Sequence, residues 1–401
     1  MLTENYTDRL SDAAACLAEG GLVAVPTETV YGLAANGMDP RAVAQIYSVK
    51  GRPENKPISL LVSGPEAMDV LCEDVPDVAR ALANAFWPGP LTIVLKAKPG
   101  IPSILRAGGE TIALRCPAHE TTLALLSKLP FPLAAPSANP SGSESPITIT
   151  KVLEYFDGKI EGCIDGGDCH LGHESTIFDM SKYPYEILRQ GALSAYDIDV
   201  TLITKIDLIG ITGGTGCGKT SALNVAKKMG AIVIDADEVY HELLKSNVQL
   251  RNVLKERFPE LIGDGEIDTK KIGDYVFANP EALRDLNQIT HRFVSKEIMG
   301  RLSDWAKMGG KFAVIDAIAL VENGVGSICK ATVAITAPAE ARLARLMRRE
   351  GVSEEYARLR IAAQKPNEFF EEVCDYTICN DSSIETFYAE CEAVFKKILE
   401  K

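Results

Sequence analysis

Short apolar segments alternate along the second half of the chain with longer segments in which apolar residues recur every three or four positions. The short segments predict strands at 206–212, 231–235, 312–316, 331–336 and 375–379. The longer segments predict helices at 218–229, 280–308, 338–349, 353–364 and 383–399. Because strands alternate with helices, this half is expected to form a doubly wound parallel sheet.

The first half shows a less regular pattern that still contains both kinds of element. Helices are predicted at 8–19 and 40–50, and strands at 21–25, 58–62 and 91–96. Pro and Gly cluster at 87–90 and 136–142, which predicts loops there. The segment PTETVYGLAANG, residues 26–37, is expected to be the end of a strand followed by a polar turn, and residues 186–194 close the region.

Length and composition place these elements in two domains of a globular enzyme. A chain of 401 residues is too long for one ordinary core, and we expect domains at 1–200 and 206–401. Its 46% hydrophobic and 24% charged residues are typical of globular proteins. The polar N-terminus and ten cysteines without framework spacing favour a cytoplasmic protein that does not associate with membranes. A net charge of −13, most of it before residue 200, argues against stable nucleic-acid binding but allows a local basic cleft.

The strongest chemical motif directly follows the strand predicted at 206–212. The sequence ITGGTGCGKT matches the phosphate-loop pattern G-x-x-x-x-G-K-[S/T], between a strand and a helix. Its glycines let backbone N–H groups converge on phosphate oxygens, and the start of the following helix adds the positive end of its dipole. Lys219 supplies a charge for the β- and γ-phosphates, and Thr220 can ligate Mg²⁺. We therefore expect ATP to bind at Gly214, Thr215, Gly216, Cys217, Gly218, Lys219 and Thr220.

Carboxylates and arginines surround this loop in the predicted fold. Asp235 ends the strand at 231–235 and Asp237 follows it, at the sheet edge where ligands of parallel α/β sheets bind. One of them could accept a proton from an attacking hydroxyl and the other could hold Mg²⁺ through water, or the pair could cap a helix. Asp316 ends another strand at the same edge. Arg342, Arg345, Arg348 and Arg349 lie on one predicted helix, where they could close over phosphates or form a solvated basic face.

From about residue 206 to 400, the chain resembles the dephospho-CoA kinase family. The residues that carry the likeness are ITGGTGCGKT, DAD at 235–237, VENG at 321–324, RREGVS at 348–353, RIAAQ at 360–364 and Asn380. The resemblance implies Mg²⁺-dependent transfer of the ATP γ-phosphate to the 3′-hydroxyl of dephospho-CoA. It also implies that Asp237 is the base, that Arg345 and Arg349 are lid residues, and that a helical insert at 240–308 with His291 cradles the pantetheine arm.

Some positions depart from that family's pattern, around the acceptor pocket and the lid. Arg292 stands where Pro is usual, Ala317 and Ala319 stand in a segment that is usually Asp-x-Pro-Leu-Leu, and Phe370 replaces a basic residue. They leave open a second possibility, in which this half is a degenerate scaffold that binds ATP without transferring phosphate. Cys217 lies inside the phosphate loop, where the charge of the helix start could lower the pKa of its thiol and make it oxidisable.

The first half carries cations and hydroxyls in several separate segments. Lys50, Arg52 and Lys56 fall in SVKGRPENKPIS, where Pro53 and Pro57 exclude a regular helix. Such a loop can aim its cations at one anion, or it can be a solvent-exposed basic loop. Further polar residues stand at predicted turns and strand ends: Thr27, Thr29, Tyr31, Arg115, Ser137, Asn139, Ser141, Glu174, Ser175, Thr176 and Arg189.

Together these segments resemble the threonylcarbamoyl-AMP synthase (YrdC-type) family, from about residue 8 to 196. The matching segments are PTETVYGL, KGRP…KPIS, WPGPLT, the strand ending at Arg115, PSANPSG, GHEST and LRQGALS. The resemblance implies a twisted mixed sheet with a basic cavity, where L-threonine, bicarbonate and ATP give threonylcarbamoyl-AMP and pyrophosphate for tRNA modification. It implies that Lys50 and Arg52 are catalytic, and that Thr29, Tyr31, Lys56, Ser59, Arg115, Ser137, Asn139, Ser175 and Arg189 bind threonine and ATP.

The two resemblances together predict a bifunctional enzyme with possible partners among tRNA-modification proteins. A different class of function also stays open, in which the first half binds RNA in its basic cleft and the second senses nucleotide. The acidic balance and the lack of stripes of alternating aromatic and basic residues argue against that reading. The group Cys163, Cys169, His170 and His173 matches no common zinc module, so no metal site is expected there.

Overall fold

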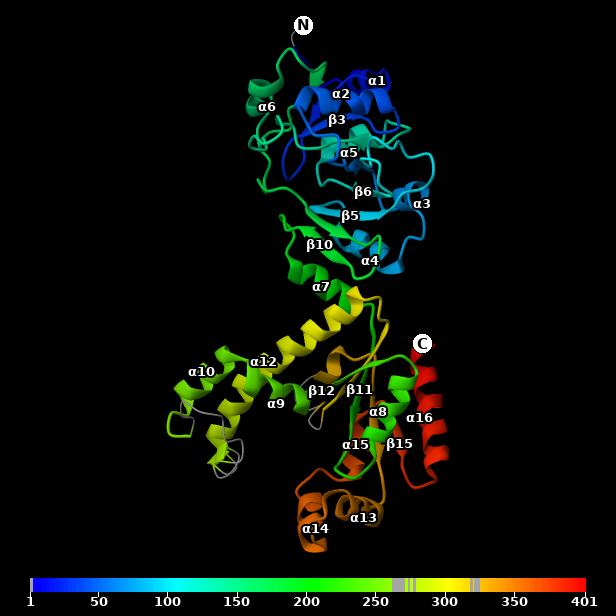
Figure 1. Cartoon of the computed structure of the whole chain (residues 1–401), viewed down its shortest axis with the longest axis vertical. Helices are drawn as coiled ribbons and strands as arrows, with labels where there is room; N and C mark the ends of the chain where they lie inside the picture. The colour runs from blue at the N-terminus through cyan, green and yellow to red at the C-terminus, as the bar shows by residue number, and fades with distance from the viewer. Residues whose placement is uncertain (1–2, 262–270, 273–274, 277–278, 318–319, 321–324) are drawn as a thin grey trace. The chain divides into compact units, whose positions relative to one another are not determined.

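Two separate sheets organise the chain in the computed structural model, which describes residues 3–261, 271–272, 275–276, 279–317, 320 and 325–401. The chain divides into two compact units, Met1–Leu202 (unit 1) and Ile203–Lys401 (unit 2), shown in Figure 1. Each unit is an α/β structure with its own sheet. No described helix is both long and apolar enough to cross a bilayer.

Unit 1 is built on a mixed sheet of ten strands in the order β1-β8-β2-β3-β7-β4-β6-β5-β9-β10. Parallel pairs such as β5 with β9 lie beside antiparallel pairs such as β5 with β6. Five of these strands, β1, β2, β4, β7 and β8, are only two or three residues long. The strands are β1 (Glu4–Asn5), β2 (Val23–Val25), β3 (Gly32–Asn36), β4 (Leu60–Leu61), β5 (Leu91–Lys96), β6 (Thr111–Arg115), β7 (Leu133–Ala134), β8 (Gly162–Cys163), β9 (Thr176–Asp179) and β10 (Glu186–Arg189).

Seven helices of unit 1 pack around this sheet: α1 (Leu10–Ala18), α2 (Pro40–Lys50), α3 (Ala67–Leu71), α4 (Asp77–Phe86), α5 (Glu120–Leu126), α6 (Ile149–Phe156) and α7 (Ala195–Ile203). Helix α2 shows why the sequence forms a helix with these ends. The Asp39 carboxylate accepts a hydrogen bond from the backbone N–H of Arg41, and Pro40 occupies the first helical position. Gly51, at φ +58°, ends the helix in the left-handed conformation, which leaves Lys50 in the last turn.

The segment 26–37 differs from its prediction. Residues 32–36 form strand β3, which pairs antiparallel with β2, so the polar turn is confined to the residues before Gly32. The Thr27 hydroxyl holds this turn, because it accepts from the N–H groups of Thr29 and Val30 and donates to the carbonyl of Val30. The apolar residues of GLAAN were therefore strand residues, whose alternation was hidden because nearly all of them are buried.

Unit 2 has a sheet of five strands, all parallel, in the order β12-β13-β11-β14-β15. Its strands agree with the prediction to within one residue at each end: β11 (Asp207–Thr212), β12 (Ile232–Asp235), β13 (Phe312–Asp316), β14 (Ala331–Thr336) and β15 (Tyr376–Cys379). Because β12 and β13 are neighbours in register, Asp235 and Asp316 stand side by side at the carboxyl edge. The phosphate loop follows β11, which is the next strand.

The helices of unit 2 form three groups, which Figure 1 separates clearly. Helices α8 (Lys219–Lys228) and α16 (Ile384–Leu399) pack together beside the sheet and share its apolar core. Helices α9 (Ala236–Ser246), α10 (Val248–Arg257) and α12 (Pro280–Lys307) form the predicted insert. Helices α13 (Ala339–Glu350) and α14 (Glu354–Ala362) form a hairpin, followed by α15 (Asn367–Val373), and a short 3-10 helix, η1 (Val325–Ile328), precedes β14. The VENG segment at 321–324 and Ala319 lie outside the described residues.

Candidate functional sites

Lys50 occupies a buried position at the end of α2, although lysine is rarely buried. Its side chain is 3% exposed and its ammonium donates hydrogen bonds to the backbone carbonyls of Ser137 and Asn139. The N–H of Ser141 donates in turn to the Lys50 carbonyl, at 2.8 Å, so the PSANPSG loop is held against the end of the helix. Burial, and then the nearby charge of Arg52, lowers the pKa of Lys50 to about 7. The Lys50 ammonium is therefore bonded to neutral carbonyls, and no ion pair with a carboxylate is seen among the described residues.

The loop after α2 folds around the Arg52 guanidinium. Arg52 Nε donates to the Lys56 carbonyl at 3.2 Å, and Nη2 donates to the Pro57 carbonyl at 2.9 Å. The Tyr47 hydroxyl donates to the same Lys56 carbonyl at 2.9 Å. Burial lowers the pKa of Arg52, whose side chain is half-buried, whereas Lys56 is exposed and Ser59 is half-buried. The loop is thus a folded structure that fixes Arg52, rather than a freely solvated basic segment.

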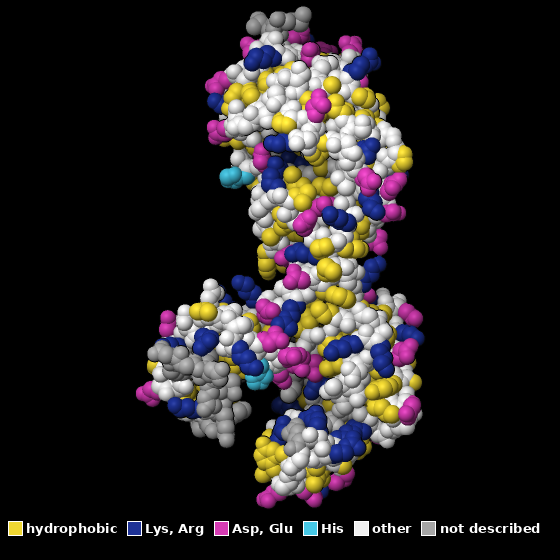
Figure 2. Space-filling model, in the orientation of Figure 1, with side chains coloured by type: hydrophobic (Ala, Val, Ile, Leu, Met, Phe, Trp, Pro, Cys, Tyr) yellow, Lys and Arg dark blue, Asp and Glu magenta, His cyan; other side chains and the backbone are white. Residues whose placement is uncertain are grey.

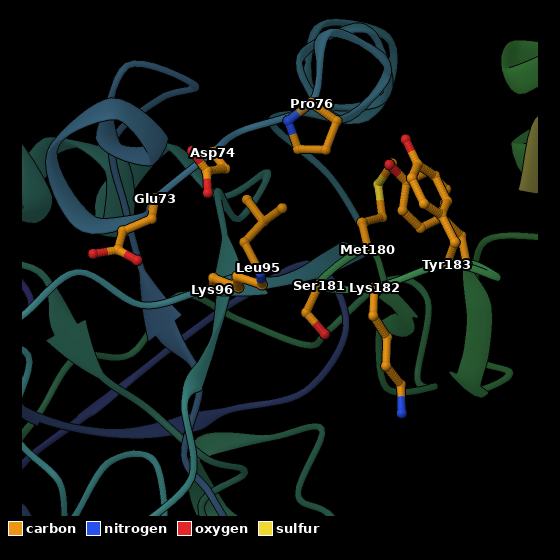
Figure 3. Close-up of a pocket in the computed structure, with 10 residues that line it drawn as sticks. Glu73, Asp74, Pro76, Leu95, Lys96, Met180, Ser181, Lys182 and Tyr183 are labelled. Atoms are coloured by element: carbon orange, nitrogen blue, oxygen red, sulfur yellow. The ribbon is translucent and has the colours of Figure 1, made fainter. Parts of the chain in front are cut away.

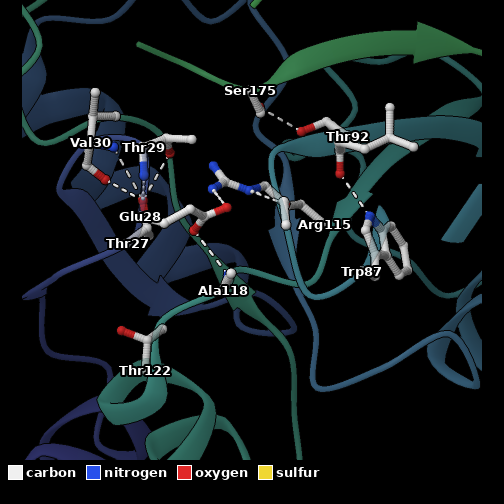
Figure 4. A network of polar contacts seen from close by, with 12 residues as sticks. Thr27, Glu28, Thr29, Val30, Trp87, Thr92, Arg115, Ala118, Thr122 and Ser175 are labelled. Carbon is white, nitrogen blue, oxygen red and sulfur yellow. Dashed lines mark hydrogen bonds and ion pairs between the residues drawn. The ribbon is translucent and has the colours of Figure 1, made fainter. Parts of the chain in front are cut away.

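Arg115, at the end of β6, forms the most buried ion pair of unit 1 (Figure 4). Its Nη2 lies 2.7 Å from Glu28 Oε1, and both side chains are less than a tenth exposed. The second Glu28 oxygen accepts from the N–H of Ala118 at 2.9 Å, and Arg115 Nε donates to the Gly89 carbonyl at 3.2 Å. Burial lowers the pKa of Arg115 in spite of Glu28, and the neighbouring charge of Arg189 acts in the same direction. Two turns of the chain thus orient one guanidinium from both sides.

Arg189, on β10, organises a second polar group with the GHEST segment. It donates to the Ser175 carbonyl at 2.8 and 3.1 Å and lies 3.0 Å from a Glu174 oxygen. The other Glu174 oxygen accepts from the Ser145 hydroxyl at 2.9 Å. The buried Ser175 hydroxyl lies 2.8 Å from that of Thr92 on β5, as Figure 4 shows. These bonds bring three segments, far apart in the sequence, to one place.

Thr29 and Tyr31, which were expected to seat threonine, are both fully buried. The Thr29 hydroxyl lies 2.9 Å from that of Thr27. The Tyr31 hydroxyl donates to the Gly167 carbonyl at 2.7 Å and accepts from the N–H of Gly166 at 3.1 Å. Burial raises the pKa of the Tyr31 phenol well above its usual value. Both hydroxyls thus have partners within the protein, and their contact with a ligand stays a prediction.

The structure therefore brings most of the predicted cations of unit 1 within electrostatic reach of one another. Arg52 acts on the pKa of Lys50, and Arg189 acts on that of Arg115. Glu174 connects the two pairs, because it contacts Arg189 and also acts on Lys50. On the visible face of unit 1, Figure 2 shows Lys and Arg side chains gathered around a hollow. Among the described residues, Asn139 Oδ1 is one of the buried side-chain atoms without a hydrogen-bond partner.

A different hollow of unit 1 contains none of these residues. It has a volume of about 270 Å³ and lies between the turn at Glu73–Asp74, strand β5 and the segment after β9 (Figure 3). Its wall carries both signs of charge, with Lys96 and Lys182 as well as the two carboxylates. Since no predicted site residue lines it, the chemistry expected for unit 1 does not belong there.

In unit 2, the phosphate loop has the backbone conformation that its glycines predict. Gly213, Gly216 and Gly218 all have positive φ, at +143°, +81° and +109°. At Gly218, which caps α8, a Cβ would also stand 2.1 Å from Asn380 Nδ2, so no larger residue fits. Lys219 is the first residue of α8, and its ammonium donates to the Gly213 carbonyl at 3.1 Å across the loop. The Thr220 side chain is exposed at the helix start.

Three carboxylates stand at the sheet edge beside this loop. Asp235 caps α9, because its Oδ1 accepts from the N–H groups of Asp237 and Glu238, so the capping alternative holds for this residue. Asp316 is 8% exposed, and burial raises its pKa to about 6 even though Lys219 Nζ lies 3.8 Å away. Partial removal from water, followed by the charge of Asp235, also raises the pKa of Asp237. Figure 2 shows acidic side chains on the wall of a deep notch in unit 2.

These residues fit a magnesium ion that is shared with phosphate. Asp316 Oδ1 is buried and has no hydrogen-bond partner among the described residues, which is an unfavourable state for an oxygen that carries negative charge. Mg²⁺ is commonly held by one or two protein oxygens together with phosphates and water. Asp316 and Thr220 are therefore suitable ligands. In the described part of the chain, no three His, Cys, Asp or Glu side chains could hold a metal by themselves, and this includes Cys163, Cys169, His170 and His173.

The arginines of α13 lie against the phosphate loop in different ways. Arg342 is 4% exposed and its Nε donates to the Thr215 carbonyl at 3.0 Å. Arg345 donates to the carbonyl and side chain of Asn380, both at 3.0 Å, and lies within 3.4 Å of the Gly216 and Cys217 carbonyls. Arg348 and Arg349 are exposed. Arg342 and Arg345 thus hold the loop by its carbonyls, which leaves contact of Arg345 and Arg349 with phosphate as a prediction.

Two expectations for unit 2 change in the structure. Burial raises the pKa of the Cys217 thiol, and this outweighs the opposing charges of Lys219 and Arg342, so the lowering that the helix start could cause does not prevail. Phe370, which replaces an expected basic residue, is 3% exposed in α15 and cannot offer a polar group to a ligand. Ala317 directly follows β13, and both Arg292 and His291 lie on α12, where Arg292 is exposed and His291 half-buried.

Two residues with evident roles were missed from the sequence. Glu28 lies inside the PTETV segment and holds Arg115, but nothing in the local pattern distinguishes it from a surface glutamate. Gln364 ends the RIAAQ segment and contacts Thr215 through both atoms of its amide. The RIAAQ motif could have drawn attention to Gln364. The role of Glu28 could be seen only from its contact with the buried Arg115 in the folded chain.

Comparison with known proteins divides the chain at the same place as the structure. A family model described as telomere recombination, which groups Sua5, YciO and YrdC, matches residues 15–191. A second, described as dephospho-CoA kinase, matches residues 207–386.

Curated relatives match one half of the chain or the other. The chain is 46% identical over 187 residues to threonylcarbamoyl-AMP synthase of Pyrococcus abyssi, covering 47% of this chain and 55% of that protein. It is 34% identical over 191 residues to a putative threonylcarbamoyl-AMP synthase of Mycobacterium tuberculosis, covering 48% and 88%. It is 33% identical over 190 residues to dephospho-CoA kinase of Bdellovibrio bacteriovorus, covering 47% and 94%. The chain thus spans about half the length of the first of these relatives.

Among solved structures, the chain is similar to P. abyssi Sua5 complexed with L-threonine. The identity is 27%, the TM-score is 0.49, and the match covers 80% of this chain and 93% of that one.

Proposed function

The chain joins a Sua5/YrdC domain of the threonylcarbamoyl-AMP synthase family to a dephospho-CoA kinase domain, and from this premise we propose that it is a bifunctional enzyme with two separate ATP sites. Unit 1 converts L-threonine, bicarbonate and ATP to threonylcarbamoyl-AMP and pyrophosphate. Unit 2 transfers the ATP γ-phosphate to the 3′-hydroxyl of dephospho-CoA. The observation that carries this proposal is that each unit has its own set of charged groups suited to a polyphosphate, with no residue in common.

The reaction proposed for unit 1 requires two anions to meet. Threonine carboxylated on its nitrogen is negatively charged, and its carbamate oxygen attacks the α-phosphorus of ATP while the bond to pyrophosphate breaks. The repulsion between them must be offset, which Lys50, Arg52, Arg115 and Arg189 are suited to do. Burial already lowers the pKa of the first three, so a bound anion would be favourable to each of them.

The carboxylates of unit 1 support this role by fixing the cations in place. Glu28 orients Arg115, and Glu174 orients Arg189. A guanidinium that is already held needs little reorganisation when charge develops on the transferring phosphate. No side chain of this group acts as a nucleophile in the proposed reaction, which consists of alignment and charge neutralisation. The unpartnered Asn139 Oδ1 is suited to accept a hydrogen bond from the nucleotide or from threonine.

The reaction proposed for unit 2 relies on the phosphate loop and the carboxylates beside it. The loop's N–H groups and Lys219 would hold the β- and γ-phosphates, as they do in phosphate loops generally. When bound at Asp316 and Thr220, Mg²⁺ would neutralise charge on the phosphates. Asp237 lies at the same carboxyl edge of the sheet and its pKa is raised. A carboxylate with a raised pKa is suited to take the proton from the 3′-hydroxyl. Asp235, which is engaged as the α9 cap, would position Asp237 rather than accept that proton.

The direct test is to incubate the purified full chain with ATP, Mg²⁺, threonine, bicarbonate and dephospho-CoA and to follow all products by mass spectrometry. Threonylcarbamoyl-AMP should form only when threonine and bicarbonate are both present, and CoA only when dephospho-CoA is present. Formation of CoA without threonylcarbamoyl-AMP would contradict the proposal for unit 1. The reverse result would favour the alternative in which unit 2 is an ATP-binding scaffold.

A further inference from the structure

The hairpin of α13 and α14 is not part of the main core of unit 2. It has a small apolar core of its own, formed by Leu343, Leu346 and Ala357, with Met347, Val352 and Ile361 packed against it. The main core contains residues of the sheet, α8 and α16, and none from this hairpin. Figure 1 shows the two helices beyond the end of the sheet where the phosphate loop lies. Polar contacts are therefore important in setting where the hairpin stands.

One such contact joins Gln364, just after α14, to Thr215 in the phosphate loop. Gln364 Oε1 accepts from the Thr215 N–H at 2.7 Å, and Nε2 donates to the Thr215 hydroxyl at 2.6 Å. Arg342 completes the group, because its Nη2 donates to the same Oε1 and its Nε to the Thr215 carbonyl, both at 3.0 Å. The N–H, the carbonyl and the hydroxyl of one loop residue are thus all bound by the hairpin segment.

A second contact acts on the next residues of the loop. Arg345 and Asn380 surround the Cys217 carbonyl, which accepts from Asn380 Nδ2 at 2.9 Å. A phosphate loop binds its ligand through N–H groups, so its carbonyls must be directed elsewhere. Arg342, Arg345 and Asn380 donate to the carbonyls of Thr215 and Cys217. These bonds help to orient the peptide groups of the loop so that N–H groups can point toward a phosphate. At Gly214 a Cβ would lie 2.3 Å from Arg342 Nη2, so a side chain there would displace the guanidinium from its contacts.

We propose that Gln364 is a positioning residue that couples the α13–α14 hairpin to the phosphate loop through Thr215, so that nucleotide binding and hairpin position form one equilibrium. The inference rests on the proposed nucleotide site of unit 2. A nucleotide that prefers the loop conformation held by Gln364 also favours the docked hairpin, and a docked hairpin slows the release of nucleotide.

The test uses three single variants of the full chain and the double variant of Gln364 and Thr215. Gln364→Ala removes all three hydrogen bonds of the amide, and Thr215→Val removes one of them while keeping the side chain's shape. Arg358→Ala is the control, since it breaks the exposed ion pairs with Glu340 and Glu354 within the hairpin and leaves the loop contacts intact. Circular dichroism of each variant establishes that it folds.

The first measurement is the dissociation rate of a fluorescent ATP analogue from unit 2 in the presence of Mg²⁺. Loss of the Gln364 amide should speed dissociation of the analogue about tenfold, and Thr215→Val about threefold, because the first change removes three hydrogen bonds and the second removes one. The Arg358→Ala control should stay within about twofold. Since the two residues act through one contact, the double variant should dissociate no faster than Gln364→Ala alone. Unchanged rates in Gln364→Ala, or additive effects in the double variant, would overturn the proposal.

The second measurement separates coupling from a merely structural contribution. At saturating ATP, trypsin should cleave the wild-type hairpin at Arg348 and Arg349 more slowly than without ATP. In Gln364→Ala, saturating ATP should give no such protection, because ATP still occupies the phosphate loop but the loop is no longer bonded to the α13–α14 hairpin. Equal protection of the variant and the wild type would show that hairpin position does not depend on Gln364.

Failure of the proposed function would look different. If the wild-type chain bound no ATP, the proposed function of unit 2 would fall. The contact itself would still be tested by amide hydrogen exchange without nucleotide. Peptides that contain Thr215 should exchange faster in Gln364→Ala than in Arg358→Ala, and equal exchange would overturn the inference.

Discussion

The two units assemble their charged groups in opposite ways. In unit 1, cations from three separate segments are gathered, and burial lowers the pKa values of Lys50, Arg52 and Arg115. In unit 2, carboxylates gather beside a backbone loop, and burial raises the pKa values of Asp316 and Asp237. The first arrangement is incomplete without an anion, and the second without a cation. These pKa shifts support the proposal that unit 1 receives an anion and that unit 2 receives a metal cation.

The largest effects are expected from removing one key cation of each unit. Arg52→Ala should abolish threonylcarbamoyl-AMP formation, and Lys219→Ala should abolish CoA formation, each by about a thousandfold or more. In both variants the other activity should stay within about twofold, because the units share no site residue. Assaying both products in both variants checks this. Loss of both activities in either variant would break the comparison, since it would make the sites interdependent.

The buried ion pair of unit 1 should have a large effect on stability. Glu28→Gln leaves the Arg115 guanidinium buried without its charge partner, which should cost about 3 kcal/mol of unfolding free energy in unit 1. Denaturant unfolding followed by fluorescence of Trp87, which is buried in unit 1, measures this. Asp69→Asn, which breaks the exposed pair with Arg80, is the control and should change little. A Glu28→Gln chain as stable as the control would mean that the pair does not hold Arg115.

In unit 2, the carboxylates allow the proton acceptor to be distinguished from its neighbours. Asp237→Asn should lower kcat for CoA formation about a hundredfold, the usual contribution of a general base, with little change in ATP affinity. Glu238→Gln, on the same exposed turn of α9, should remain within about twofold. Steady-state kinetics and ATP titration of both variants decide this. If Asp237→Asn kept full kcat, the base would have to be sought elsewhere, with Asp316 the next candidate.

The smallest expected effect is the pH dependence of ligand affinity in each unit. It tests the comparison closely, because the two units should respond to pH with opposite signs. Lys50, with its pKa lowered to about 7, is charged below that pH, so ATP affinity of unit 1 should weaken as pH rises through 7. Asp316, with its pKa raised to about 6, is charged above that pH, so divalent-cation affinity of unit 2 should weaken as pH falls through 6. Changes of up to about tenfold are expected for one unit charge at a partly shielded site.

Each pH profile can be measured without interference from the other unit. ATP titrations of Lys219→Ala report on unit 1, and Mn²⁺ titrations of Arg52→Ala report on unit 2. Lys50→Met and Asp316→Asn should flatten the respective profiles. Profiles that slope in the same direction would contradict the opposite charge deficits described for the two units.

The same contrast explains how much of each site could be predicted from the sequence. The phosphate loop is contiguous, and its glycines and Lys219 act through local backbone geometry, so residues 206–220 predicted both the element and the chemistry. The strands of unit 2 were also predictable, since most of their residues are apolar and each alternates with a helix. In unit 1, strands of two or three residues, such as β4 and β7, are too short to carry a periodic pattern.

What could not be predicted depends on pairs of residues that are distant in the sequence. Glu28 and Arg115 meet only in the folded chain, and Thr215 and Gln364 are 149 positions apart. The direction of the Cys217 pKa shift was also missed, because the helix start was weighed without the burial that opposes it. Family resemblance located the segments of unit 1, but the partners that orient each cation required the structure.

The most direct test of two independent ATP sites is the stoichiometry of ATP binding to the full chain, measured by titration calorimetry with Mg²⁺ and threonine present. The account predicts two ATP molecules per chain, with one lost in Arg52→Ala, the other lost in Lys219→Ala, and none bound by the double variant. A wild-type chain that binds a single ATP, or a double variant that still binds one, would contradict it.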